Sequence, residues 1–155
     1  MADLEERVQR LEAIEGIRRL KIRYAQLCDA NYDPPGLTAL FTEDAVWDGG
    51  DLGRYEGHDQ IRGFWEGASK SFTFALHYMI GHTIDVDPPF TSGTGHWYIW
   101  EPATVNGRAV FLGATYDDVY QKVGGEWRFK QVNANLHFFT PYEDGWVKTP
   151  MMPMD

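Results

Sequence analysis

The second half of the chain is a series of long β-strand patterns joined by short turn signals. The predicted strands cover 72–87, 93–104, 109–122 and 126–140. Two of the joints contain Asn106-Gly107 and Gly124-Gly125, and such pairs suit tight turns because they accept positive φ. Strands with so little chain between them pair antiparallel. This half therefore predicts one antiparallel meander, not the strand–helix alternation of a parallel sheet.

The first half is predicted to be mostly helical. Apolar residues recur every three or four positions from Leu4 to Leu27, which is the spacing of one buried helix face. We expect a helix over 4–30 with a break at Gly16, because glycine is a poor helix former, and an end before Pro34. The elements expected next are a short helix and turn over 36–45, a hairpin over 46–57 and a helix over 58–70.

Helices followed by long antiparallel strands predict an α+β fold. The chain has 155 residues, which fits a single domain. We expect a curved sheet that wraps around N-terminal helices within 1–31 and forms a cone-shaped barrel with a pocket inside. Residues 141–155 are expected to form an extended tail.

Charge and composition exclude several partners. Fourteen Lys and Arg against 23 Asp and Glu give a net charge of −9, which repels a phosphate backbone and argues against nucleic acid. No run approaches the ~20 apolar residues of a membrane helix, and the charged start has no apolar signal core. Cys28 is the one cysteine, so no intrachain disulfide forms. We expect a cytoplasmic protein with a small, hydrophobic ligand.

Two histidines lie in the first long strand, and they raise the question of a metal or a base. His77 and His82 have opposite parity, so they face opposite sides of the strand unless a bulge intervenes. A shared metal is therefore not expected, and the chain has no compact His-x-His group. Small residues surround His77 on its face, which leaves space for a ligand beside the imidazole. We expect no metal and no cofactor.

Asp29 is the candidate partner of His77. It lies at the end of the long helix, and it could accept the Nδ1 proton if that helix end meets the strand. Tyr24 lies on the buried stripe of the same helix and could donate into the same cavity. The alternative reading is that Asp29 is an ordinary turn residue and His77 an ordinary strand residue; the spacing leaves both open.

In two other predicted strands, the alternation of side chains indicates which residues share a face. Trp97, Ile99 and Glu101 share one face, and a desolvated Glu101 would be protonated unless it is paired. In the last strand, the same parity contains polar and aromatic residues, namely Gln131, Asn133, Asn135, His137, Trp127, Phe129 and Phe139. This row is either a solvated outer face or a subunit interface, and the aromatic residues favour the interface.

Several segments resemble the SnoaL-like branch of the nuclear-transport-factor-2-like superfamily. "LKIRYAQLCD", "HTIDVD" and "TGHWYIWE" resemble its bile-acid 7α-dehydratases, whereas "LHY", "GATYDDVYQKVGGEWRF" and "NANLHFFTP" resemble its hexachlorocyclohexane dehydrochlorinases. The resemblance covers nearly the whole chain and implies the cone-shaped α+β barrel. It also implies a homo-oligomer, with a trimer favoured over a dimer.

The resemblance implies roles for individual residues. His77 falls on the catalytic base, Asp29 on its partner and Tyr24 on an active-site tyrosine, while Glu101 and Trp47 fall on pocket positions. The expected substrate-binding residues are Trp47, Trp97, Ile99, Glu101, Leu112, Val132 and Leu136; Phe41 is a further candidate for the aromatic wall. Both groups of relatives place an arginine in the pocket from the last strand, where this chain has Val132 and Leu136.

These expectations combine into a cofactor-independent lyase of the dehydratase type. His77 would remove a proton from carbon in a hydrophobic, polycyclic hydroxylated substrate, and Tyr24 or Glu101 would assist the leaving hydroxyl. An isomerase, a polyketide cyclase or a dehydrohalogenase could use the same scaffold. A non-catalytic ligand-binding or assembly module, or a partner subunit of an oxygenase, is the alternative from another class.

Overall fold

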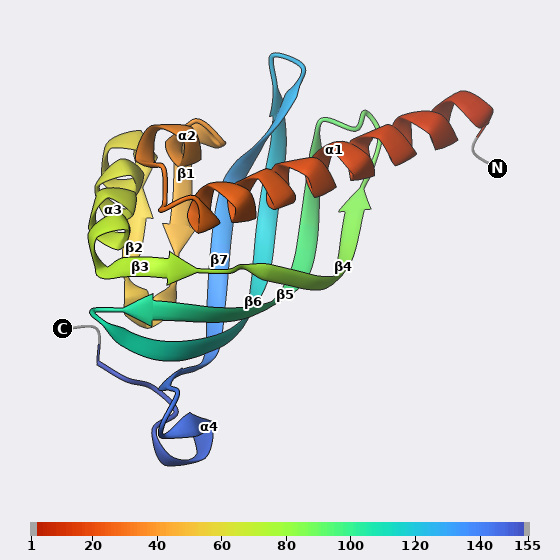
Figure 1. Ribbon diagram of the computed structural model, residues 1–155. Coiled ribbons are helices and arrows are strands. Elements are labelled where there is room, and N and C mark those ends of the chain that lie inside the picture. The colour runs from red at the N-terminus through yellow and green to blue at the C-terminus, as the bar shows by residue number, and fades with distance from the viewer. Residues whose placement is uncertain (1–2, 154–155) are drawn as a thin grey trace.

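The computed structural model describes residues 3–153, and its long first helix crosses one side of a curled sheet (Figure 1). The helices are α1 (Leu4–Asp29), α2 (Pro34–Thr38), α3 (Gly57–Ser71) and α4 (Gly145–Lys148). The strands are β1 (Phe41–Asp48), β2 (Arg54–Glu56), β3 (Phe72–Ala75), β4 (Tyr78–Val86), β5 (Ser92–Val105), β6 (Arg108–Val123) and β7 (Glu126–Pro141), and the 3₁₀ turn η1 (Gly50–Leu52) precedes β2.

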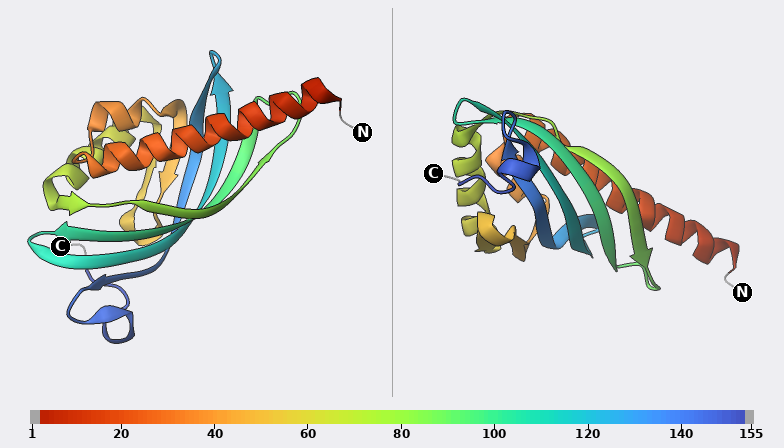
Figure 2. Two further views of the ribbon diagram at one scale, coloured as in Figure 1. Left: turned by 45° about the vertical axis from the view of Figure 1, so that its right-hand side comes forward. Right: turned by 90° about the horizontal axis from the view of Figure 1, so that it is seen from below.

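The sheet has the strand order β2-β1-β7-β6-β5-β3, and β4 continues from β3 along the same edge of β5. The β5–β6–β7 meander is antiparallel, as the turn signals predicted, whereas β1 adds to β7 in parallel. The sheet bends around α1, and α3 closes one end (Figure 2). We call the side that faces α1 and α3 the inner face and the other side the outer face. The predicted α+β cone-shaped barrel is confirmed, with a mixed sheet.

The first helix is continuous, so the predicted break at Gly16 is wrong. Asp3 caps its start by accepting a hydrogen bond of 2.8 Å from the Glu6 backbone N–H. Gly16 serves a packing role instead: a Cβ atom there would lie 2.5 Å from Cδ1 of Trp127. Glycine is therefore required at this helix position, although it is a poor helix former, because the Trp127 indole from β7 occupies the space that a side chain would need.

Three predicted segments differ in detail. The expected strand 72–87 is interrupted at Leu76 and His77, which lie between β3 and β4. The short helix expected over 36–45 ends at Thr38, and β1 already begins at Phe41. The tail is not simply extended, because it forms α4 and then folds back so that Met151 pairs with Phe139.

Bulges overturn the strict alternation expected in two strands. Gly81, with φ of 48°, shifts the register between β4 and β5, so His82 moves to the inner face and stacks on Trp97 at 4.6 Å. In β7, register shifts near Lys130 and His137 reverse the alternation twice. As a result the aromatic and polar residues of the row separate: Trp127, Phe129 and Phe139 are buried in the core, whereas Gln131, Asn133, Asn135 and His137 lie on the outer face.

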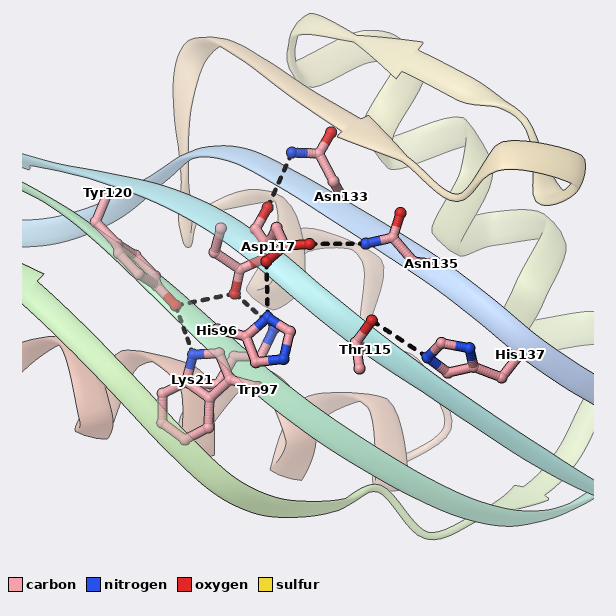
Figure 3. A network of polar contacts seen from close by, with 10 residues as sticks. Lys21, His96, Trp97, Thr115, Asp117, Tyr120, Asn133, Asn135 and His137 are labelled. Atoms are coloured by element: carbon pink, nitrogen blue, oxygen red, sulfur yellow. Dashed lines mark hydrogen bonds and ion pairs between the residues drawn. The ribbon is translucent and has the colours of Figure 1, made fainter.

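The two faces of β6 carry two different polar networks (Figure 3). On the inner face, the Lys21 Nζ lies 2.7 Å from Asp118 Oδ2 with both side chains fully buried, and Tyr120 donates to the same oxygen at 2.9 Å. On the outer face, the Asp117 carboxylate binds the His96 ring at 2.7 Å and the Asn135 amide at 2.9 Å. Neighbouring residues of one strand therefore have opposite environments.

Candidate active site

Asp29 and His77 meet at the point where the first strand is interrupted. Asp29 is the last residue of α1, and its Oδ1 accepts hydrogen bonds from both the backbone N–H and the ring Nδ1 of His77, each at 2.8 Å. The backbone N–H is available because His77 lies outside the strand ladder. Binding at Nδ1 leaves Nε2 as the ring nitrogen on the side away from Asp29. The end of the first helix therefore does meet the segment that carries His77, as an Asp29–His77 hydrogen bond requires.

Glu101 lies on the other side of the imidazole. Its Oε2 is 3.4 Å from His77 Nε2, and both side chains are only 4% exposed. Tyr32 donates to the second oxygen, Oε1, at 3.4 Å. Burial raises the pKa of the Glu101 carboxyl because desolvation disfavours the charged form. Burial lowers the pKa of His77, but the charges and hydrogen bond of Glu101 and Asp29 outweigh it, so the net pKa is raised.

These groups border a cavity of about 770 Å³, a size that suits a drug-sized organic ligand. The cavity lies between α3, the β1–β2 hairpin and the inner face of β5, β6 and β7. Aromatic side chains form much of its wall, namely Tyr24, Tyr32, Trp47, Tyr55, Phe64, Trp65, Phe72 and Tyr116. Polar side chains also line it, namely Asp51, Arg54, Gln60 and Ser71. An apolar ligand with few polar groups fits this lining.

The structure brings most of the predicted site residues together. The predicted residues that line the cavity are Tyr24, Trp47, His77, Glu101, Leu112 and Leu136. Asp29 lies behind His77 and does not border the cavity. Tyr24 also touches the predicted wall directly, because the Trp47 indole Nε1 donates to its hydroxyl at 3.2 Å, and burial raises the pKa of this phenol.

Four predicted wall residues lie elsewhere, so these expectations are wrong. Trp97, Ile99, Val132 and Phe41 are buried in the core and do not line the cavity. Trp97, for example, donates to the Tyr120 hydroxyl at 2.9 Å. Alternation assigned Trp97 and Ile99 to the correct inner face, but α1 packs across that part of the sheet and only the Glu101 end of β5 reaches the cavity.

Sequence reasoning missed several lining residues. Tyr32 was hidden in the turn after α1, where the sequence was read only as a helix stop, and its φ of 53° is unusual for an aromatic residue. Trp65 lies on α3, within the helix expected over 58–70, and it lines the cavity. Tyr116 has the same parity as Leu112 on β6, so alternation alone could have identified it.

An arginine does line the cavity, but it comes from a different strand than in the resembling enzymes. Arg54 lies on β2, and its guanidinium pairs with Asp48 at 3.2 Å and Glu56 at 2.9 Å. Of the two β7 positions compared with the arginine of those enzymes, Leu136 lines the cavity and Val132 is buried in the core. The charge of the arginine at this site is therefore already balanced by two carboxylates.

Residues 3–153 contain neither a side-chain group placed to hold a metal ion nor a helix that could cross a membrane. These residues contain no group of three or more His, Cys, Asp or Glu side chains placed to hold a metal ion. His82, the second histidine of the strand, lies 3.3 Å from the Arg18 guanidinium. None of the helices in this part of the chain is long and apolar enough to cross a membrane.

Comparisons with known proteins agree with the fold. The pattern of a family described as the SnoaL-like domain matches residues 9–133. A putative scytalone dehydratase from Novosphingobium aromaticivorans superposes with a TM-score of 0.80 at 24% identity, over 86% of this chain and 90% of that one. A hexachlorocyclohexane dehydrochlorinase from Novosphingobium barchaimii gives 0.77 at 18% identity, over 86% and 92%.

A putative aromatic ring hydroxylase from Novosphingobium aromaticivorans superposes with a TM-score of 0.78 at 22% identity, over 86% of this chain and 96% of that one. Among curated proteins, no sequence match was found. At such identities the structural likeness shows the common fold, and the chemistry has to be argued from the site itself.

Proposed function

Because the chain belongs to the SnoaL-like domain family, we propose that it is a cofactor-independent lyase of the dehydratase type. In this proposal His77, held by Asp29, removes a proton from carbon in a hydrophobic, polycyclic hydroxylated substrate. The observation that carries the proposal is the position of His77. Its Nδ1 is bound to Asp29 at 2.8 Å, and its Nε2 lies beside Glu101 in the wall of a large apolar cavity.

The first step requires a neutral imidazole with a free electron pair on Nε2. Glu101 supplies this state when it holds the proton that would otherwise lie on Nε2. Burial raises the pKa of Glu101 and favours this state, whereas the raised pKa of His77 favours the imidazolium paired with a carboxylate, so both states are accessible to the pair. Asp29 holds the Nδ1 proton and stabilises the imidazolium that forms when Nε2 takes the substrate proton. The substrate hydrogen would lie next to a carbonyl or similar group, since such a group makes the C–H bond acidic enough for a histidine base.

The second step is departure of the hydroxyl group. Glu101 donates its proton to the leaving oxygen, the C–O bond breaks, a C=C bond forms and water is released. His77 then carries one extra proton and Glu101 one fewer, and transfer across the 3.4 Å between Nε2 and Oε2 restores the starting state. Tyr24 is the second candidate donor because burial raises its pKa and keeps the phenol protonated.

The cavity favours a neutral substrate. Its wall is largely aromatic and aliphatic, and among the described lining residues Arg54 is the sole guanidinium or ammonium group. Because Arg54 is paired with Asp48 and Glu56, a carboxylate or a departing halide gains little from it. A hydroxylated polycyclic ketone meets these demands better than a chlorinated hydrocarbon does, which places dehydrohalogenation behind dehydration.

The proposal is tested by incubating the protein with hydroxylated steroids and polyketide-type ketones in D₂O buffer, followed by mass spectrometry. A dehydratase yields a product that has lost water. His77→Gln should abolish turnover, and Asp29→Asn should lower it by roughly 10²–10⁴-fold. His82→Gln is the matched control because His82 lies outside the cavity. Full activity of His77→Gln would show that His77 is not the base.

Two other functions would give different results in the same experiment. An isomerase or a polyketide cyclase would exchange or move hydrogen without loss of water, since it shares only the first step. A non-catalytic binding module is the alternative, in which the contact between Nε2 of His77 and Glu101 only holds the imidazole in place. Such a module would bind the compounds and return them unchanged, without deuterium.

We also propose that the protein forms a homo-oligomer through the outer face of the sheet. Large apolar side chains are more than half exposed there, including Tyr78, Ile80 and Tyr98. Ile80 and Tyr98 are direct partners across the β4–β5 ladder, so they form one continuous patch. An exposed patch of this kind is typical of an interaction surface.

A further inference from the structure

Tyr32 occupies a strained turn that directs its side chain into the site. Asn31 and Tyr32 follow α1 with φ of 63° and 53°, the left-handed region that non-glycine residues other than Asn and Asp seldom adopt. The Tyr32 backbone N–H donates to Cys28 at 3.0 Å and the Asp33 N–H donates to Leu27 at 3.3 Å. These bonds close the helix end, and they hold a backbone conformation that an aromatic residue adopts only at a cost.

Aromatic neighbours fix the ring of Tyr32 from three sides. It stacks on Trp65 at 6.0 Å, packs against Phe72 at 5.3 Å and meets the His77 ring edge-on at 5.7 Å. These partners come from α3, β3 and the interruption between β3 and β4. The side chain therefore has little freedom, and its hydroxyl is held toward Glu101 Oε1, 3.4 Å away.

We propose that Tyr32 is a positioning residue that determines which oxygen of Glu101 carries the proton exchanged with His77. This inference rests on the proposed function, because it concerns the same acid–base pair. The phenol is a donor at neutral pH, since burial raises its pKa far above the working range. A donor at Oε1 makes Oε1 the accepting oxygen, so the proton of the neutral carboxyl is placed on Oε2. Oε2 is the oxygen that faces His77 Nε2.

Loss of the hydroxyl should change the state of His77 in a defined direction. The Tyr32 hydrogen bond stabilises the charged form of Glu101. Without it, Glu101 holds its proton more tightly and offers less negative charge to the imidazolium. The ratio of imidazolium to imidazole at His77 should therefore fall at a given pH, by roughly two- to tenfold, as expected for one hydrogen bond.

The experiment is a pH titration of the histidine ring nitrogens by ¹⁵N NMR in the full-length protein. Tyr32→Phe removes the hydroxyl and keeps the ring that packs on Trp65 and Phe72. Tyr142→Phe is the matched control, because it removes a hydroxyl from an exposed tyrosine that does not line the cavity. We expect the His77 titration to move to lower pH in Tyr32→Phe alone. A His77 titration that is the same in Tyr32→Phe and wild type would overturn the proposal.

A second measurement keeps the test decisive if Tyr32→Phe does not fold. Fluorotyrosine at position 32 keeps the hydroxyl and makes it a stronger donor, so the His77 titration should move the opposite way, to higher pH. No movement, or movement to lower pH, contradicts the proposed role. The titration needs no substrate: a wild-type protein without lyase activity would disprove the proposed function, whereas the NMR result would still decide the role of Tyr32.

Discussion

At the scale of single residues, the Asp29 carboxylate both holds the candidate base His77 in position and stabilises the positive charge of its imidazolium. Asp29 accepts from the backbone and from the ring of His77 through the same oxygen. The backbone bond sets where the histidine lies, and the ring bond sets its tautomer. A helix end and a strand interruption thus meet through a single side chain, which is why either element alone gives no sign of the contact.

Asp29→Asn should separate the charge of this contact from its geometry. An asparagine oxygen can still accept from the backbone, but the imidazolium loses its negative partner. We expect the pKa of His77 to fall and the imidazolium-to-imidazole ratio to drop roughly tenfold or more at a given pH. The NMR titration of His77 in wild type and Asp29→Asn measures this. Identical titrations would mean that the two residues are not electrostatically coupled.

The same contact predicts how stability depends on pH. The folded-state pKa of His77 is raised above the ordinary histidine value of about 6.5, so its contribution is fully present below about pH 6.5 and is lost as pH rises through the folded pKa. The raised pKa of Glu101 acts in the same direction. Urea unfolding of wild type should thus show a loss of stability over this range, and Asp29→Asn should flatten it. A variant slope equal to that of wild type would contradict the assignment.

A third residue-scale prediction concerns the buried ion pair. Lys21 and Asp118 are both fully buried, and Lys21 Nζ also lies 3.5 Å from the centre of the Tyr116 ring. Lys21→Met leaves the Asp118 charge without its partner and should cost about 3–5 kcal/mol of unfolding free energy, whereas Lys21→Met with Asp118→Leu should recover most of it. Chemical denaturation of wild type, Lys21→Met, Asp118→Leu and the double variant measures this, and a loss in the double variant equal to the sum of the two single losses would show that the pair is not coupled.

At the scale of elements, glycine-to-alanine substitution should change stability in opposite directions at two helix positions, because one glycine is closely packed and the other is not. Gly16→Ala should destabilise the protein by about 1–3 kcal/mol despite the better helix propensity of alanine, because the new methyl group overlaps Trp127. Gly67→Ala in α3 meets nothing within 4 Å, so it should stabilise by about 0.5–1 kcal/mol. Thermal and urea unfolding give both values. A stabilising Gly16→Ala would show that the indole moves aside easily.

The elements also show where sequence reasoning succeeds and fails. The antiparallel β5–β6–β7 meander, its tight turns and the positions of the two longest helices followed from periodicity, because turn chemistry and apolar spacing are local properties. The errors in side-chain facing lie at Gly81, Lys130 and His137, where one extra residue reverses which face each following side chain takes. A bulge depends on the partner strand, so the alternation of one strand cannot reveal it.

At the scale of the whole molecule, the cavity is a property that no single segment encodes. Asp29, His77 and Glu101 were identified as candidates because each has chemistry that stands out in its segment. Tyr32 and Trp65 could not be assigned to the site, because their role depends on how the end of α1, α3 and the sheet close around one space. Trp97 and Ile99 were assigned to it wrongly for the same reason, since α1 covers their part of the inner face.

The outer face gives the last prediction, on self-association. Ile80 and Tyr98 are 55% and 56% exposed, and burial against a second copy would remove this apolar surface from water. We expect sedimentation to show a homo-oligomer for wild type and a smaller species for Ile80→Glu, because a buried unpaired carboxylate opposes association. Val123→Glu, at the tip of the β6–β7 hairpin, is the matched control with 48% exposure. If both variants sediment like wild type, the contact lies elsewhere, and a monomeric wild type would exclude self-association.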